Sequence, residues 1–278
     1  MSATHLSVRD ALYEKPGPRT QKIITAVTVI SVLLLAAFVA AAVRQFAVSG
    51  QLDGKYWSFF LQLSTWRFIG QGLLGTASAA LIGGALALAA GFFMMLARIS
   101  RSRILNIVGT VLVEFTRGVP TLLFIYFFFL VVPQFGIKLL PIFKISIPVA
   151  ISASGVVAEV LRSGINAVPK GQREAAISLG MRNSSVFFKV VFPQAIRYVI
   201  PALIAELVIV VKDTSFAYVV SFPDLMQNAK VLISNHDALL SVYLVVAVLY
   251  ILINYLLNKL SNFTARRSSV QAVNVAEV

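Results

Sequence analysis

Six apolar runs divide this sequence, and they constrain its fold more than any other feature. A helix needs about 20 residues, with a range of about 17–25, to cross a hydrocarbon core about 30 Å thick. All six runs reach that range, which predicts an all-α fold, a polytopic membrane protein with about six transmembrane helices. The runs cover residues 23–43, 72–97, 104–132, 145–161, 195–211 and 239–260.

Composition agrees with a membrane protein and excludes several functions. Hydrophobic residues make up 58% of the chain and charged residues only 13%, against about 45–50% and about 25% in soluble proteins. The net charge is +13, but the sequence has no basic patch interleaved with aromatic residues, so we expect no nucleic-acid partner. Cysteine is absent and the two histidines, His5 and His236, lie far apart. These counts predict no disulfide, no catalytic thiolate and no metal site.

Basic residues indicate the topology, because they gather in cytoplasmic loops. With the N-terminus inside, sixteen Lys and Arg fall in inner segments and seven in outer ones, while Arg117 lies within a span. Both termini are therefore predicted to be cytoplasmic. The run 23–43 has the basic flank of a signal peptide but exceeds an apolar core of about 7–15 residues, so we expect it to be retained. The predicted segments are a cytoplasmic tail (1–21), a first span with an outer interfacial loop (22–70), a membrane core (71–261) and a second cytoplasmic tail (262–278).

Two features of the outer loop and the second span concern packing. Aromatic residues crowd residues 57–68, which suits a short helix along the membrane interface. Small residues recur in the second span, including Ala80, Gly84 and Gly91. Such residues let helices approach closely, and packing within the chain is the default interpretation over a dimer contact.

The segment 162–194 differs from an ordinary connection between spans. Its pattern predicts two short helices: Pro169 opens the first and Gly180 ends it, while Asn183 caps the second, which runs to Pro193. Ala175, Ala176 and Leu179 form an apolar side of the first helix. That side fits either a partner protein or the chain's own cytoplasmic ends.

The spacing of this segment resembles the EAA loop of ABC importer permeases. Glu174-Ala175-Ala176 is followed by three residues, Gly180, nine residues and Val190-Val191-Phe192-Pro193. The family pattern has Ile and Leu where this chain has Val190 and Phe192. The wider stretch 158–172 is similar to the branch of the family that transports polar amino acids, as are segments 71–76, 114–120 and 212–215. The resemblance covers about residues 70–260 and leaves the first span outside.

The resemblance implies a transport subunit rather than an enzyme. Its expected partners are an ABC ATPase dimer, a second permease subunit, an extracytoplasmic solute-binding protein and an amino acid, with glutamate favoured. It also implies the cytoplasmic membrane of a prokaryote. This chain has no G-x-x-x-x-G-K-[ST] phosphate loop, so no cofactor is expected on it, and ATP and Mg²⁺ would be bound by the partner ATPase. The residues implied in coupling to that ATPase are Glu174, Ala175, Ala176, Leu179, Gly180 and Pro193.

Charged residues within the spans are the candidates for a translocation path, since each costs about 2.5–3.5 kcal/mol near the bilayer centre. Glu114 and Arg117 are close enough on one helix to pair, and both a structural and a substrate role stay open. The same two roles are open for Glu159 and Glu206. The family motif adds Lys212, Asp213, Thr214 and Ser215 as a gate or path.

Two other classes of membrane protein remain as alternatives. A secondary transporter would need inverted repeats and an ion site at the midplane, and no repeat is visible. A channel would not need a partner-docking loop. An intramembrane enzyme is a poorer fit, because the sequence has no metal cluster or nucleophile–base pair.

The predicted topology can be tested by cysteine labelling, because the native chain has no cysteine. A cysteine introduced near Ser268 should be reached by an impermeant reagent only from the cytoplasmic side. Labelling from outside would contradict the arrangement.

Overall fold

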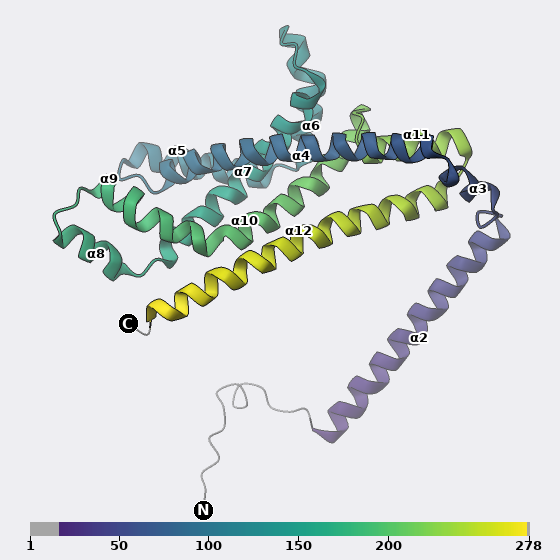
Figure 1. Cartoon of the computed structure of the whole chain (residues 1–278), viewed down its shortest axis with the longest axis horizontal. Helices are drawn as coiled ribbons and strands as arrows, with labels where there is room; N and C mark the ends of the chain where they lie inside the picture. The colour runs from purple at the N-terminus through teal and green to yellow at the C-terminus, as the bar shows by residue number, and fades with distance from the viewer. Residues whose placement is uncertain (1–16, 277–278) are drawn as a thin grey trace, which may run out of the picture. The chain divides into compact units, whose positions relative to one another are not determined.

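Helices of membrane-spanning length account for most of residues 17–276, the part of the chain that the computed structural model describes (Figure 1). The chain divides into two units, residues 1–56 and 57–278. The first unit contains α2 (Pro18–Val48), which begins with Pro18 in its first turn and has no buried residue. Thr25 and Thr28 donate their hydroxyls to carbonyls four residues earlier, so these polar groups are satisfied within the helix.

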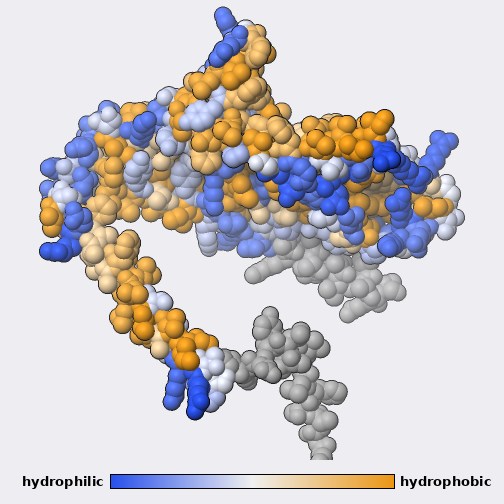
Figure 2. Space-filling model, turned by 180° about the vertical axis from the view of Figure 1, so that it is seen from behind, coloured by the Kyte–Doolittle hydropathy of each residue, from blue (hydrophilic) through white to orange (hydrophobic). Residues whose placement is uncertain are grey.

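Helices also make up the second unit, and the structure has no strand in residues 17–276. Five described helices are long and apolar enough to span a membrane, or six if the bent pair described below is one span. Figure 2 shows broad hydrophobic areas exposed on this unit, as lipid contact requires. Following α3 (Lys55–Ser58), the elements are η1 (Phe59–Leu61), α4 (Leu63–Arg98), α5 (Arg103–Gly118), α6 (Thr121–Tyr126), the π-helix η2 (Phe127–Val131), η3 (Val132–Phe135), α7 (Pro141–Ala167), α8 (Lys170–Ser178), α9 (Asn183–Val186), the π-helix η4 (Phe187–Val191), α10 (Phe192–Thr214), η5 (Ser215–Val220), α11 (Leu225–His236) and α12 (Leu239–Ala276).

Close contact between α4 and α7 forms the centre of the unit. A Cβ added to Gly91 would lie 2.8 Å from the Ser154 carbonyl oxygen of α7, and one added to Gly83 would lie 3.3 Å from the Ser146 carbonyl oxygen. Gly84 lies against Leu207 of α10 instead. The predicted packing role of the small residues in this span is confirmed within the chain.

The predicted span over 104–132 is not one continuous helix, because this stretch bends by 95° between α5 and the segment 121–135. Pro120 lacks an N–H and disfavours helical geometry at the residue before it. Val119 accordingly adopts an extended conformation (φ −93°, ψ 125°).

The aromatic outer segment was also predicted incorrectly in part. α4 begins at Leu63, nine residues earlier than expected, so the segment is not one separate interfacial helix. Its side chains satisfy carbonyls ahead of α4 instead: Thr65 donates to the Phe59 carbonyl (2.8 Å) and Trp66 Nε1 to the Phe60 carbonyl (2.7 Å). At the other end of the chain, α12 continues to Ala276, beyond the predicted end of the last span at residue 260.

The segment 162–194 forms both predicted helices, but the second one does not end where predicted. α8 ends at Ser178, and Gly180 adopts φ +77°, the left-handed conformation expected of a helix stop. Pro193 does not end a second helix, because α9, η4 and α10 follow one another without a break. It lies in the first turn of α10, directly after the π-helical turn. Asn183 is the first residue of α9, and Arg182 occupies the N-cap.

Candidate functional site

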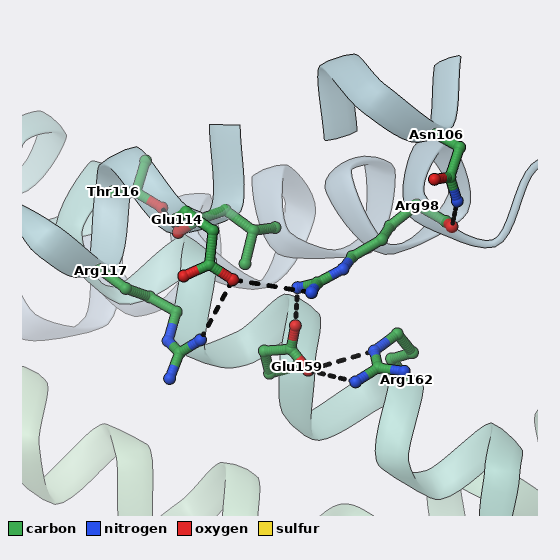
Figure 3. A network of polar contacts seen from close by, with 8 residues as sticks. Arg98, Asn106, Glu114, Thr116, Arg117, Glu159 and Arg162 are labelled. Atoms are coloured by element: carbon green, nitrogen blue, oxygen red, sulfur yellow. Dashed lines mark hydrogen bonds and ion pairs between the residues drawn. The ribbon is translucent and has the colours of Figure 1, made fainter. Parts of the chain in front are cut away.

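An ionic network ties α4, α5 and α7 together (Figure 3). Glu159 of α7 accepts two hydrogen bonds from Arg162, at 3.1 Å from Nε and 2.9 Å from Nη2. Its other carboxylate oxygen pairs with Arg98 near the end of α4. Glu159 is therefore the shared acceptor of two guanidinium groups.

The network continues to α5 through Glu114. Its carboxylate lies 3.6 Å from Arg98 Nη2 and 3.7 Å from Arg117 Nη1. Three predicted path residues, Glu114, Arg117 and Glu159, are thus brought together by the fold. The Glu114 and Arg117 side chains are 59% and 43% exposed, so their pair is worth only about 0–1 kcal/mol.

The Arg98–Glu159 pair is the more enclosed half of the network. The side chains of Arg98 and Glu159 are 19% and 22% exposed, and each would be costly to leave without its partner. Arg98 and Arg162 were missed as site residues. The three-residue spacing of Glu159 and Arg162 was a local signal, whereas no local pattern links Arg98 to Glu159.

A second polar cluster joins α6, α7 and α10. Thr121, the first residue of α6, donates its hydroxyl to Asp213 Oδ2 at 2.7 Å and lies 2.8 Å from the Ser152 hydroxyl. This contact joins the bend after Pro120 to the 212–215 segment of α10. Asp213 was predicted, whereas Thr121 and Ser152 were not. Thr121 follows directly on the 114–120 motif, which is the only sequence signal for it.

The other members of the 212–215 segment do not join this cluster. Thr214 is fully buried and donates to the Val211 carbonyl at 2.8 Å. Ser215 donates to the Lys212 carbonyl at 2.6 Å. Both hydroxyls therefore satisfy their own helix, while Lys212 is exposed. Within residues 17–276, no group of three or more His, Cys, Asp or Glu is placed to hold a metal ion.

Glu206 has a different environment from every other acidic residue in the spans. It lines a cavity of about 430 Å³ between α4 and α10, and it is 6% exposed. Aliphatic residues form the walls, and no described residue donates a hydrogen bond to the carboxylate. The expected interhelical bond is therefore absent from this arrangement. The remaining lining residues are Leu81, Gly84, Ala85, Ala87, Leu88, Val157, Ile200, Leu203, Ile204, Leu207 and Val210.

The predicted coupling surface needs one correction. Ala176 is only 5% exposed and packs against the chain's own residues, so it does not face outward as predicted. Leu179 is 83% exposed and Ile177 is 47% exposed, while Glu174, Ala175 and Gly180 are also exposed. The outward apolar surface of the loop is therefore formed by Ile177 and Leu179. The residues that cover Ala176 are Val168, Val186, Val191 and Ala195.

Comparison with known proteins places this arrangement among transport components. Residues 87–270 match the family described as binding-protein-dependent transport system inner membrane component. The chain is 34% identical over 223 residues to the glutamate transport system permease protein GluD of Corynebacterium glutamicum, covering 79% of this chain and 82% of that one. It is 32% identical over 207 residues to the probable glutamine ABC transporter permease protein GlnP of Bacillus subtilis, covering 73% and 93%.

A solved structure agrees with these relatives. The crystal structure of an amino acid ABC transporter with histidines has a chain that is 29% identical, with a TM-score of 0.70 over 75% of this chain and 98% of that one.

Replacing Glu159 by Gln should destabilise the protein by about 1–3 kcal/mol, because the amide removes the carboxylate that pairs with Arg162 and leaves Arg98 with only its contact to Glu114. Thermal unfolding of the purified protein in detergent measures this loss. Glu114→Gln is the matched control, and its more exposed side chain should cost about 1 kcal/mol or less. Equal losses in the two variants would contradict a central role for Glu159.

Proposed function

Since this chain belongs to the family of binding-protein-dependent inner membrane transport components and is an ABC transporter permease, we propose that it imports a polar amino acid, with glutamate the favoured substrate. The named relatives that transport glutamate and glutamine support this class. In this proposal the chain works with a second permease subunit, two ATPase subunits and an extracytoplasmic solute-binding protein. ATP and Mg²⁺ bind to the ATPase subunits.

The observation that carries the proposal is the exposed apolar surface of the α8 loop. Leu179 is 83% exposed. It lies outside the candidate spans, so contact with lipid does not account for its exposure. The buried side of α8, centred on Ala176, fixes this helix against α9, η4 and α10. An outward apolar residue on a fixed helix suits a rigid contact with an ATPase. Closure of the ATPase dimer would then move the loop and switch the permease pair between inward-facing and outward-facing states.

The proposed path places substrate near the two acidic residues of α10. Glu206 and Asp213 are seven residues apart, so two helical turns separate them on one side of the helix. The α-ammonium group of an amino acid is a suitable partner for a carboxylate that no described side chain neutralises. Glu114, Arg117 and Glu159 have partners in the ionic network already, and we assign them to structure rather than to substrate.

We expect Leu179→Asp to uncouple transport. A carboxylate at an apolar contact costs about 1–3 kcal/mol when it stays unpartnered, which weakens docking about five- to 150-fold. The variant should insert and fold, lose ATP-driven uptake, and retain less ATPase on purification. Ser184→Asp, which adds the same charge at an exposed position of α9, is the control.

Two further variants of the loop separate docking from folding. Ala176→Asp should lower the thermal stability of the permease itself, because the new charge would be buried within the loop. Full uptake with full ATPase retention in both Leu179→Asp and Gly180→Val would refute the coupling role of this loop.

Glu206→Gln should weaken substrate recognition within the membrane. Loss of a charge-assisted hydrogen bond costs about 1.5–3 kcal/mol, so uptake at low substrate concentration should fall about ten- to 150-fold. Radiolabelled amino-acid uptake into proteoliposomes with the complete complex measures this effect. Asp53→Asn, in the exposed outer segment, should transport normally. Normal uptake by a well-expressed Glu206→Gln would exclude the contact.

A further inference from the structure

The segment 71–76 lies within α4 and contains two glycines and a threonine, Gly72, Gly75 and Thr76. We propose that this face of α4 is a seat that fixes α11 to α4. In the transport cycle, α11 then moves together with α4, and the chain bends at the two ends of α11. This inference rests on the proposed transport function. The seat is defined here as Phe68, Gly72, Gly75 and Thr76.

The glycines of the seat bring two backbones into direct contact. A Cβ added to Gly72 would lie 2.9 Å from the Asp224 carbonyl oxygen and 2.9 Å from Leu225 Cα. A Cβ added to Gly75 would overlap the carbonyl oxygen of Pro223. These neighbours are backbone atoms, which cannot rotate away as the end of a side chain can. Any larger residue at either position would therefore push the start of α11 off α4.

Hydrogen bonds complete the seat on both sides of the glycines. Thr76 Oγ1 accepts from the Leu225 backbone N–H at 3.1 Å, which satisfies one of the free donors at the start of α11. Asn228 Nδ2, one turn further along α11, donates to the Phe68 carbonyl at 2.7 Å. Phe68, Gly72 and Thr76 are four residues apart, so they lie along one stripe of α4.

A third contact holds the far end of α11 to the segment just before α4. The His236 ring, in the last turn of α11, stacks on Phe59 of η1 with centroids 4.2 Å apart and planes 4° apart. α11 therefore runs antiparallel to α4 and η1: Leu225 meets Thr76, Asn228 meets Phe68, and His236 meets Phe59. The contact extends over the length of α11, which makes it a seat rather than a single point of attachment.

The start of α11 also has a buried polar atom that lacks a hydrogen-bond partner among the described residues. Asp224 caps α11 by accepting from the Gln227 N–H at 2.7 Å, but its second carboxylate oxygen is buried and bonds to no described protein group. Burial raises the pKa of Asp224 to about 6. On α12, the Tyr250 side chain lies near Asp224 and the Thr76 hydroxyl. Buried polar atoms are usually satisfied, so the contacts around this Asp224 oxygen are the ones expected to change.

Both connections of α11 to its sequence neighbours are turns with left-handed backbone. Ser221 has φ 56° and Asp237 has φ 53°, and they are the only described non-glycine residues with positive φ. Such residues mark sharp turns. One precedes α11 and the other follows it, so α11 is separated by a turn from η5 and by a turn from α12. The hydrogen-bonded connection of α11 is to α4.

Spin labels test this movement, because the chain has no native cysteine. Ser234→Cys on α11 is paired with Leu74→Cys on α4 or with Phe216→Cys on η5, all three at exposed positions. The complete complex is measured without nucleotide and after trapping with ATP and vanadate. The α4–α11 distance should stay the same, and the η5–α11 distance should change. A change in the first distance as large as in the second, or no change in either, would overturn the proposal.

Hydrogen exchange tests the seat without relying on transport. Gly75→Ala should increase amide exchange in segment 222–229, while Gly70→Ala, which has no neighbour within 4 Å of an added Cβ, should leave it unchanged. Equal exchange in the two variants would overturn the seat. If the wild-type chain bound no ATPase and carried out no uptake, the proposed function would fail, and this comparison would still decide whether the seat exists.

Discussion

Close approach of helix backbones is the interaction on which the rest of this structure depends. Lipid tails are as apolar as leucine, so burying an aliphatic side chain between helices gains little, and van der Waals contact must hold the helices together. Glycine provides that contact at each seam around α7: Gly91 faces α7 from α4, Gly155 meets Thr116 of α5, and Gly164 meets Ala195 of α10. α7 is thus the element against which three other helices are positioned.

Charged groups in the spans fall into two classes: those that pair with other charged side chains of the chain, and those that do not. The two guanidinium groups of Arg98 and Arg162 share the Glu159 carboxylate, and the Arg98–Glu159 pair joins α4 to α7. Glu206 lines an apolar cavity with no such neutralising group among the described residues. A charge that the fold itself does not need is the stronger candidate for contact with a substrate. The distinction depends on whether the charged side chain has an oppositely charged neighbour, and a charge within a span is not enough to make it.

Much of the fold could be predicted from local sequence, and the failures share a cause. Apolar length located the spans, and the spacing around Glu174 and Gly180 located α8 and its left-handed stop. The bend at Pro120 was missed because the apolar run continues through it, although the proline was a visible warning. The pairing of Arg98 with Glu159 and the bond from Thr121 to Asp213 depend on residues far apart in sequence, which no local pattern encodes.

The unbroken path from α9 through η4 into α10 gives this part of the chain a mechanical property. Residues 183–214 form one rod about 48 Å long at 1.5 Å per residue. Its first turns belong to the segment 162–194, and its last turn contains Asp213. A rod of that length acts as a lever, in which a sideways displacement of about 4 Å at one end produces a tilt of about 5°. The tilt arrives at the other end without any change in secondary structure between them. That value takes the far end of the rod as the pivot, and a pivot nearer the first end, such as the contact of Gly164 of α7 with Ala195 of α10, gives a larger tilt for the same displacement.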